Sequence, residues 1–326
     1  MKSLWSAFAN DFNIGAAVTP ALLRKQSAFI GKHFNSITAE NEMKFYKLHP
    51  ERNTYDFSEA EEIIHFAKEH HIKVRGHNLI WHQQTPDWVF TNKSGEGATK
   101  QELLSVMQEH IQAVVKYFRE SVYCWDVVNE AIEDGIGYLR DSKWLEIIGE
   151  EYIQKAFIFA HQAAPEALLF YNDYNAVRAD KCEKIYQLVK DLLAKDVPIH
   201  GIGIQGHWNL YWPHEDEVRR ALEKYISLGL KLQITELDVS MYSEAEGDLG
   251  LTEPTSEMLE MQAERYEAFF RIFKEYRKHI TSVTFWGVAD DYTWLDNFPV
   301  RKRKNWPFVF DINYQPKLAY NKLLNL

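Results

Sequence analysis

The stretch Val122-Tyr-Cys-Trp-Asp-Val-Val-Asn129-Glu130-Ala131 joins an apolar, β-branched run to an amide and a carboxylate. Residues 122–128 show little alternation between polar and apolar side chains, which predicts a strand buried on both faces. A buried strand that ends in Asn-Glu places the carboxyl group of Glu130 at the rim of a sheet. Taken alone, Glu130 is also explained as a cap of the following helix, since an acid near a helix start is common.

A second stretch, Lys231-Leu-Gln-Ile-Thr235-Glu236-Leu-Asp238, has the same build and also ends in a glutamate. Cleavage of a glycosidic bond needs two carboxyl groups, because one protonates the departing oxygen and the other attacks the sugar or activates water. Two buried strands that each end in a glutamate therefore favour catalysis over a structural role for both residues.

Length and charge limit the classes of protein that fit. The chain has 326 residues, of which 46% are hydrophobic and 14% aromatic, enough for one α/β barrel or two ordinary domains. Its formal net charge is −10, which argues against a polyanionic partner such as nucleic acid. A neutral or cationic ligand fits this charge better.

The two cysteines and the first residues bear on location. Cys124 lies in the expected buried strand and Cys182 in a helical pattern, so neither a disulfide framework nor a cysteine metal site is indicated. Residues 1–11 carry one basic residue and an interrupted apolar run, which does not fit a signal peptide, and no segment approaches a membrane span. We expect a cytoplasmic monomer that contacts neither membrane nor nucleic acid and needs no cofactor.

Short apolar runs alternate with longer helical patterns along the whole chain. The expected strands are residues 13–18, 36–40, 73–81, 122–130, 168–173, 201–207, 231–236 and 282–287, and the expected helices are 58–70, 99–119, 144–163, 180–194, 215–228 and 257–277. Eight strand-then-helix units without a break in composition predict a single (β/α)8 TIM barrel over residues 1–326. An open doubly wound sheet is the alternative, but no glycine-rich phosphate turn follows the first strand.

Active sites in this barrel gather at the carboxyl ends of the strands. Polar and aromatic side chains stand at nearly all of these expected ends: Glu40, Asn41, Lys44, His77, Trp81, His82, Gln84, Asn129, Glu130, Asn172, Asp173, Tyr174, Asn175, Gln205, His207, Trp208, Glu236, Asp238, Trp286 and Trp294. Indoles stack on sugar rings, while amides and acids bind hydroxyl groups, so this ring of residues indicates a sugar site.

Other readings of these residues are weaker. A single histidine or tryptophan is as often a core residue as a ligand, and His82 and His161 are best taken as structural. His77, His207, Glu236 and Asp238 include metal-ligand types, but no His-x-His ends the first expected strand, so a metal hydrolase is the weaker interpretation. The basic run at residues 301–304 fits a solvated loop near the site better than a nucleic-acid signal in an acidic chain.

Seven motifs in order along nearly the whole chain resemble those of glycoside hydrolase family 10 endo-β-1,4-xylanases. They are Thr38-Ala-Glu-Asn-Glu-Met-Lys44, Gly76-His-Asn-Leu-Ile-Trp-His82 with Pro86-Asp-Trp88, Trp125-Asp-Val-Val-Asn-Glu-Ala131, Tyr171-Asn-Asp-Tyr-Asn175, Gly201-Ile-Gly-Ile-Gln-Gly-His207, Ile234-Thr-Glu-Leu-Asp238 and Thr284-Phe-Trp-Gly-Val288. The resemblance implies a retaining glycosidase that cleaves β-1,4-xylosidic bonds of xylo-oligosaccharides through a covalent glycosyl-enzyme intermediate.

The resemblance also implies residue roles. Glu130 becomes the general acid/base and Glu236 the nucleophile, with Asn129 on the 2-hydroxyl group at the cleavage site. His207, itself oriented by Asp238, holds Glu236. The glycone subsites are lined by Glu40, Asn41, Lys44, His77, Trp81, Gln84, Gln205, Trp286 and Trp294, and Tyr174 lies on the aglycone side.

Two departures and three alternatives accompany this resemblance. Phe45 stands where the family usually has tryptophan, which bears on the distal glycone wall. The expected absence of a secretion signal resembles the intracellular branch of the family, which works on imported oligosaccharides. A β-xylosidase, a β-glucanase and a non-catalytic sugar-binding barrel are the alternatives; the last usually lacks one of the two carboxylates, whereas both stand here.

Overall fold

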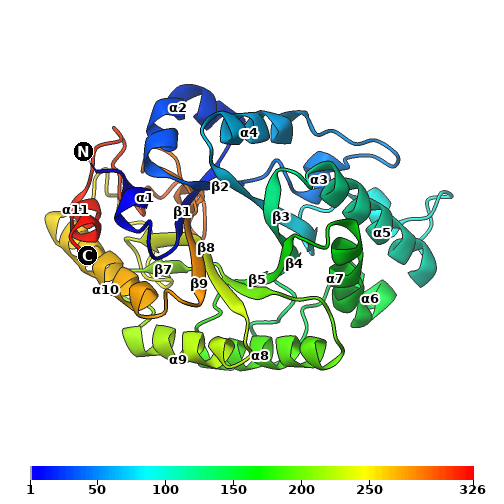
Figure 1. Cartoon of the computed structure of the whole chain (residues 1–326). Coiled ribbons are helices and arrows are strands. Elements are labelled where there is room, and N and C mark those ends of the chain that lie inside the picture. The colour runs from blue at the N-terminus through cyan, green and yellow to red at the C-terminus, as the bar shows by residue number, and fades with distance from the viewer. Residues whose placement is uncertain (1) are drawn as a thin grey trace.

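Eight parallel strands close into a barrel in the computed structural model, which describes residues 2–326 (Figure 1). Each strand pairs with the next around the ring, and β9 pairs with β1 to close it. The barrel strands are β1 (Asn13–Val18), β2 (Ser36–Ala39), β3 (Lys73–Trp81), β4 (Val122–Asn129), β5 (Leu168–Asp173), β6 (Gly201–Ile204), β8 (Lys231–Ser240) and β9 (Ile280–Phe285). The (β/α)8 barrel expected from the sequence is confirmed.

Helices surround this ring and bury their apolar faces against it (Figure 1). The main ones are α2 (Pro20–His33), α4 (Ser58–Glu69), α5 (Lys100–Tyr117), α7 (Glu151–Ala163), α8 (Ala179–Ala194), α9 (Glu215–Ile226), α10 (Ser256–Glu275) and α11 (Leu318–Leu324). Shorter helical segments are α1 (Leu4–Ala7), α3 (Phe45–Leu48), α6 (Lys143–Ile148), η1 (Asp87–Phe90) and η2 (Trp294–Asp296). The two ends of the chain lie together, since Tyr320 donates a hydrogen bond to the Lys2 carbonyl.

Three expected elements differ from the observed ones. The expected helix 144–163 is two helices, because Gly149 adopts a φ of 89° between α6 and α7. The expected strand 201–207 stops at Ile204, since Gly206 turns the chain with a φ of 78° before the short strand β7 (His207–Asn209). The strand that carries Glu236 runs on to Ser240 because β7 pairs with its end.

Helix α2 was not expected from the sequence. Its apolar periodicity is interrupted, and Gln26 has non-helical backbone angles inside it. The signal that marks its start is local: the Thr19 side chain accepts a hydrogen bond from the Leu22 amide, and Pro20 occupies the first turn.

The two faces of β4 carry different side chains. Trp125 is fully buried on the face toward the helices, near Phe118, and a Cβ atom on Gly76 would come within 2.2 Å of its ring, so glycine is required there. The next residue, Asp126, faces the barrel interior. Arg75 is fully buried as well, and its Nη2 lies 2.7 Å from Asp126 Oδ1, while its Nε donates to Gln233 Oε1 at 2.6 Å. This paired, hydrogen-bonded layer supports the residues above it.

Candidate active site

A cleft of about 720 Å³ opens at the carboxyl ends of the barrel strands. All but one of the residues to which the resemblance assigns a role line it: Glu40, Asn41, Lys44, His77, Trp81, Asn129, Glu130, Tyr174, Gln205, His207, Glu236, Asp238, Trp286 and Trp294. Asn172 and Asp173, also expected at this face, are fully buried beneath it. The residues that line the cleft come from β3, β4, β7 and β8 and from the segments after β2, β4, β5, β6 and β9. The barrel therefore gathers residues that lie far apart in the chain around one opening.

Some expectations differ from the observed cleft. Gln84 is exposed and does not line the cleft, whereas its neighbour Gln83 does. A positive φ of 48° at Gln84 turns the chain there, and its carbonyl accepts a hydrogen bond from Tyr46 instead. His82, expected to be structural, also lines the cleft. Phe45 is buried against the ring of His110, at 3.5 Å between centroids, and does not form part of the cleft wall.

Glu130 stands directly after β4 with a buried carboxylate. Its Oε2 accepts a hydrogen bond from Trp81 Nε1 at 2.9 Å. Its Oε1 accepts from Gln205 Nε2 at 3.0 Å and from Asn129 Nδ2 at 3.2 Å. All three donors are neutral, so the hydrogen bonds orient this carboxyl group without placing a cation on it.

Glu236 has different surroundings. Its Oε1 accepts a hydrogen bond from Asn172 Nδ2 at 2.8 Å, and its Oε2 lies 3.2 Å from His207 Nε2. Burial by itself raises the pKa of Glu236, but the attraction of His77 and the hydrogen bond and charge of His207 outweigh it and hold the pKa below its ordinary value. Glu236 is therefore an ionised carboxylate at neutral pH.

His207 lies between two carboxylates. Its Nδ1 is 2.9 Å from Asp238 Oδ2, and Trp294 Nε1 donates to the same oxygen at 2.9 Å. Burial disfavours the charged imidazole, but Asp238 and Glu236 together raise the pKa of His207 to about 10. Both ring nitrogens then carry protons, so His207 donates to Glu236 and keeps it aimed into the cleft. The expected chain from Asp238 through His207 to Glu236 is present.

Asn172, expected at a strand end, has a role that the sequence did not assign. It is fully buried at the end of β5, and its Nδ2 donates both to Glu236 and to Asn129 Oδ1, at 2.9 Å for the latter. Thr235 in turn donates to Asn172 Oδ1 at 2.6 Å. One amide thus links the residue beside Glu130 to Glu236. Its position at a strand end was the signal available in the sequence.

The segment after β2 contributes a cluster of polar side chains to the cleft wall. Lys44 Nζ donates to Asn41 Oδ1 at 3.0 Å and lies 5.0 Å from the centroid of the Trp81 ring. Tyr292, which sequence reasoning missed, donates to Glu40 Oε1 at 2.9 Å. Amide, carboxylate and ammonium groups beside an indole are suited to the hydroxyl groups and apolar face of a sugar ring.

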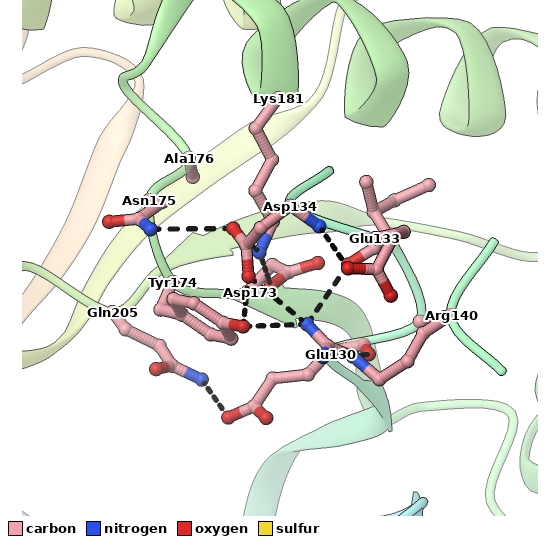
Figure 2. Close-up of polar contacts among 12 residues, drawn as sticks. Glu130, Glu133, Asp134, Arg140, Asp173, Tyr174, Asn175, Ala176, Lys181 and Gln205 are labelled. Carbon is pink, nitrogen blue, oxygen red and sulfur yellow. Dashed lines mark hydrogen bonds and ion pairs between the residues drawn. The ribbon is translucent and has the colours of Figure 1, made fainter. Parts of the chain in front are cut away.

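The cleft wall after β5 contains Tyr174, and beside it lies Arg140, a residue that sequence reasoning missed. Arg140 Nη2 donates to the Tyr174 hydroxyl at 2.6 Å, and Asp134 and Lys181 complete the cluster (Figure 2). Arg140 lies in the loop before α6, so no strand-end pattern marks it. Arg303, from the basic run 301–304, is buried and also lines the cleft, whereas Arg301, Lys302 and Lys304 are exposed.

Three further observations concern metal ions, membrane spans and cysteines. Among residues 2–326, no group of three or more His, Cys, Asp or Glu side chains is arranged to hold a metal ion. Over the same residues, no helix is both long and apolar enough to cross a membrane. Cys124 and Cys182 are free and buried.

The contact between His207 and Glu236 should affect the pH dependence of activity. In the His207→Gln variant the cation beside Glu236 is lost, so the carboxylate binds a proton more readily and its pKa rises. We expect the acidic limb of kcat/KM, which lies below the ordinary glutamate pKa of 4.5, to move to higher pH. A His65→Gln variant on the exposed face of α4 is the control. An unmoved limb in His207→Gln would show that His207 does not tune Glu236.

Comparison with known proteins places the chain in a family. The model of glycosyl hydrolase family 10 matches residues 3–326. Endo-1,4-beta-xylanase B of Paenibacillus barcinonensis is 54% identical, covering 99% of this chain and 98% of the relative, and an endo-1,4-beta-xylanase of Geobacillus stearothermophilus is 53% identical, covering 100% and 99%. A solved mutant structure in complex with xylotriose superposes with a TM-score of 0.98 at 46% identity, covering 100% of both chains. On these grounds the chain belongs to glycosyl hydrolase family 10.

Proposed function

We propose that this protein is a retaining endo-1,4-β-xylanase that cleaves β-1,4-xylosidic bonds by double displacement. The observation that carries the proposal is the pair Glu130 and Glu236, which lie directly after β4 and within β8 and share one cleft with different surroundings. Glu236 is paired with a charged histidine and stays ionised, while Glu130 is held by neutral donors alone. A nucleophile and a proton donor need this difference.

The reaction follows from these roles. Glu236 attacks the anomeric carbon, and the bond from that carbon to the leaving oxygen breaks while Glu130 gives its proton to this oxygen. The resulting glycosyl ester on Glu236 is then attacked by water, whose proton Glu130 takes up as the ester bond breaks. Both carboxyl groups return to their starting state, and the anomeric configuration is kept.

The remaining cleft residues bind the sugar rings in this proposal. Asn129, whose Oδ1 accepts a hydrogen bond from Asn172, binds the 2-hydroxyl group. The glycone side is lined by Glu40, Asn41, Lys44, His77, Trp81, Gln205, Trp286 and Trp294, and Tyr174 lies on the aglycone side. The names of the close relatives and the xylotriose bound to one solved structure support a xylo-oligosaccharide as substrate.

Proton NMR of the first products tests both substrate and mechanism. With xylotriose, we expect the new reducing end to appear first as the β-anomer and to mutarotate later, because two displacements restore the configuration. Initial α-anomer would contradict the retaining mechanism. Faster cleavage of cellotriose than of xylotriose would favour a β-glucanase. Release of xylose alone from the chain end of xylohexaose would favour a β-xylosidase, and binding without cleavage would favour a non-catalytic barrel.

The cytoplasmic location and the monomeric state stay predictions from the sequence. Cell fractionation with immunodetection tests the first, and size-exclusion chromatography with light scattering tests the second. Enzyme recovered mainly from the culture medium without lysis would contradict the expected location.

A further inference from the structure

The main chain at Glu130 adopts an unusual conformation. Its φ of 56° lies in the left-handed region, which a residue with a side chain rarely adopts. Every polar main-chain group around it has a partner. The Glu130 amide donates to the Asn172 carbonyl at 2.9 Å, and the amides of Ala131 and Ile132 donate to the Tyr171 hydroxyl at 3.0 and 3.1 Å. The surrounding structure therefore imposes this conformation.

Arg140 completes the set of partners. Its Nε donates to the Glu130 carbonyl at 2.9 Å, and its Nη2 faces the Ile132 carbonyl at 3.2 Å. The same Nη2 donates to the Tyr174 hydroxyl at 2.6 Å and lies 3.4 Å from Asp134 Oδ2. The guanidinium group is planar with fixed donor directions, so one side chain holds the backbone of Glu130 and a residue of the cleft wall in a fixed relation (Figure 2).

Asp134, the acidic partner of Arg140, is held by a buried ion-pair network. Lys181 Nζ lies 2.9 Å from both Asp134 Oδ1 and Asp173 Oδ1, and the Lys181 and Asp173 side chains are 1% and 0% exposed. Asp173 in turn accepts a hydrogen bond from the Tyr171 hydroxyl, the group that receives the two amides after Glu130. The contacts thus run from the Glu130 carbonyl through Arg140 and this network to the Tyr171 hydroxyl and back to the two amides after Glu130. Figure 2 shows Arg140, Asp134, Lys181 and Asp173 of this ring.

The same ring includes the cleft wall. The Tyr174 hydroxyl donates to Asp134, and Lys181 Nζ lies 3.5 Å from the centroid of the Tyr174 ring. Asn175 also donates to Asp134, at 3.3 Å, and both Tyr174 and Asn175 line the cleft. A sugar ring packed against Tyr174 therefore contacts the hydrogen-bond network that holds the main chain of Glu130.

We propose that Arg140 is a positioning residue for proton transfer by Glu130. It holds the left-handed main chain at Glu130 and couples it to Tyr174, so that the carboxyl group meets the leaving oxygen of a sugar bound against Tyr174. This inference rests on the proposed role of Glu130 as acid/base. Arg140 itself transfers no proton and contacts no reacting atom.

A positioning role predicts a dependence on the leaving group. Dinitrophenolate departs without a proton, whereas phenolate and a sugar alkoxide need one, so misplacement of Glu130 slows only the latter substrates. In Arg140→Met, which keeps the apolar stem and loses all donors, we expect kcat/KM on phenyl β-xylobioside and xylotriose to fall roughly 10–100-fold. On dinitrophenyl β-xylobioside the first turnover should keep nearly its full rate.

Two further variants keep the test decisive. Arg140→Lys retains the positive charge but loses the planar, forked donors of the guanidinium group, so it should show the same dependence on the leaving group to a smaller degree. It replaces Arg140→Met in the test if circular dichroism shows that Arg140→Met does not fold. Arg119→Met, on an exposed pair with Glu166, is the matched control and should behave as wild type. Equal losses on all three substrates in a folded Arg140 variant, or no loss on any, would overturn the inference.

Glu130→Ala, measured on the same substrates, separates this inference from the proposed function. A leaving-group dependence in Glu130→Ala but not in the Arg140 variants leaves the acid/base assignment in place and removes the role of Arg140. If Glu130→Ala itself shows no such dependence, the proposed role of Glu130 is wrong, and the inference fails with it.

Discussion

Replacement of Glu236 by alanine is expected to abolish turnover of every substrate, with kcat reduced by at least about 10⁴-fold. Without this carboxylate no covalent intermediate forms. Glu236 is the carboxylate that both Asn172 and His207 contact, so no other acid takes over its role. Initial rates with xylotriose and with dinitrophenyl β-xylobioside measure the effect. A Glu253→Ala variant at an exposed position controls for the substitution itself. Residual turnover within tenfold of wild type on either substrate would exclude Glu236 as nucleophile.

Replacement of Glu130 by alanine is expected to have a large but selective effect. Turnover of xylotriose should fall by about 10²–10⁴-fold, because the leaving oxygen no longer receives a proton. With dinitrophenyl β-xylobioside the intermediate should still form and then break down slowly, since no base activates water. Stopped-flow absorbance should therefore show a burst of phenolate equal to the enzyme concentration. If the burst is absent in Glu130→Ala but present in Glu236→Ala, the two roles are reversed.

The barrel could be predicted from the sequence because its strands are short, buried on both faces and regularly separated by amphipathic helices. The helices predicted at 58–70 and 99–119 agree with α4 and α5 to within two residues at each end. The errors have local causes. The break at Gly149 and the turn at Gly206 depend on positive φ angles that a periodic pattern does not reveal. The kink at Gln26 interrupts the pattern that would have marked α2.

Most of the cleft could be predicted for a different reason. In a parallel barrel all strands end at the same face, so a polar residue at a strand end belongs to the site whatever its distance along the chain. This rule placed Glu130, Glu236 and His207 in one cleft. It could not find Arg140, which reaches Glu130 from a loop, and it does not fix side-chain direction in turns, which is why Gln83 and not Gln84 faces the cleft.

The central claim is that Glu236 forms a covalent bond to the sugar, and trapping that intermediate tests it most directly. A dinitrophenyl 2-deoxy-2-fluoro-β-xylobioside combines a good leaving group with a fluorine that slows hydrolysis of the ester, so the glycosyl-enzyme should accumulate. Mass spectrometry of the intact protein, followed by peptic digestion, locates the added sugar. We predict one fluoroxylobiosyl group per chain, on the peptide that contains Glu236. An adduct on Glu130 would contradict the mechanism. So would an enzyme that stays active and carries no label after prolonged incubation with this reagent.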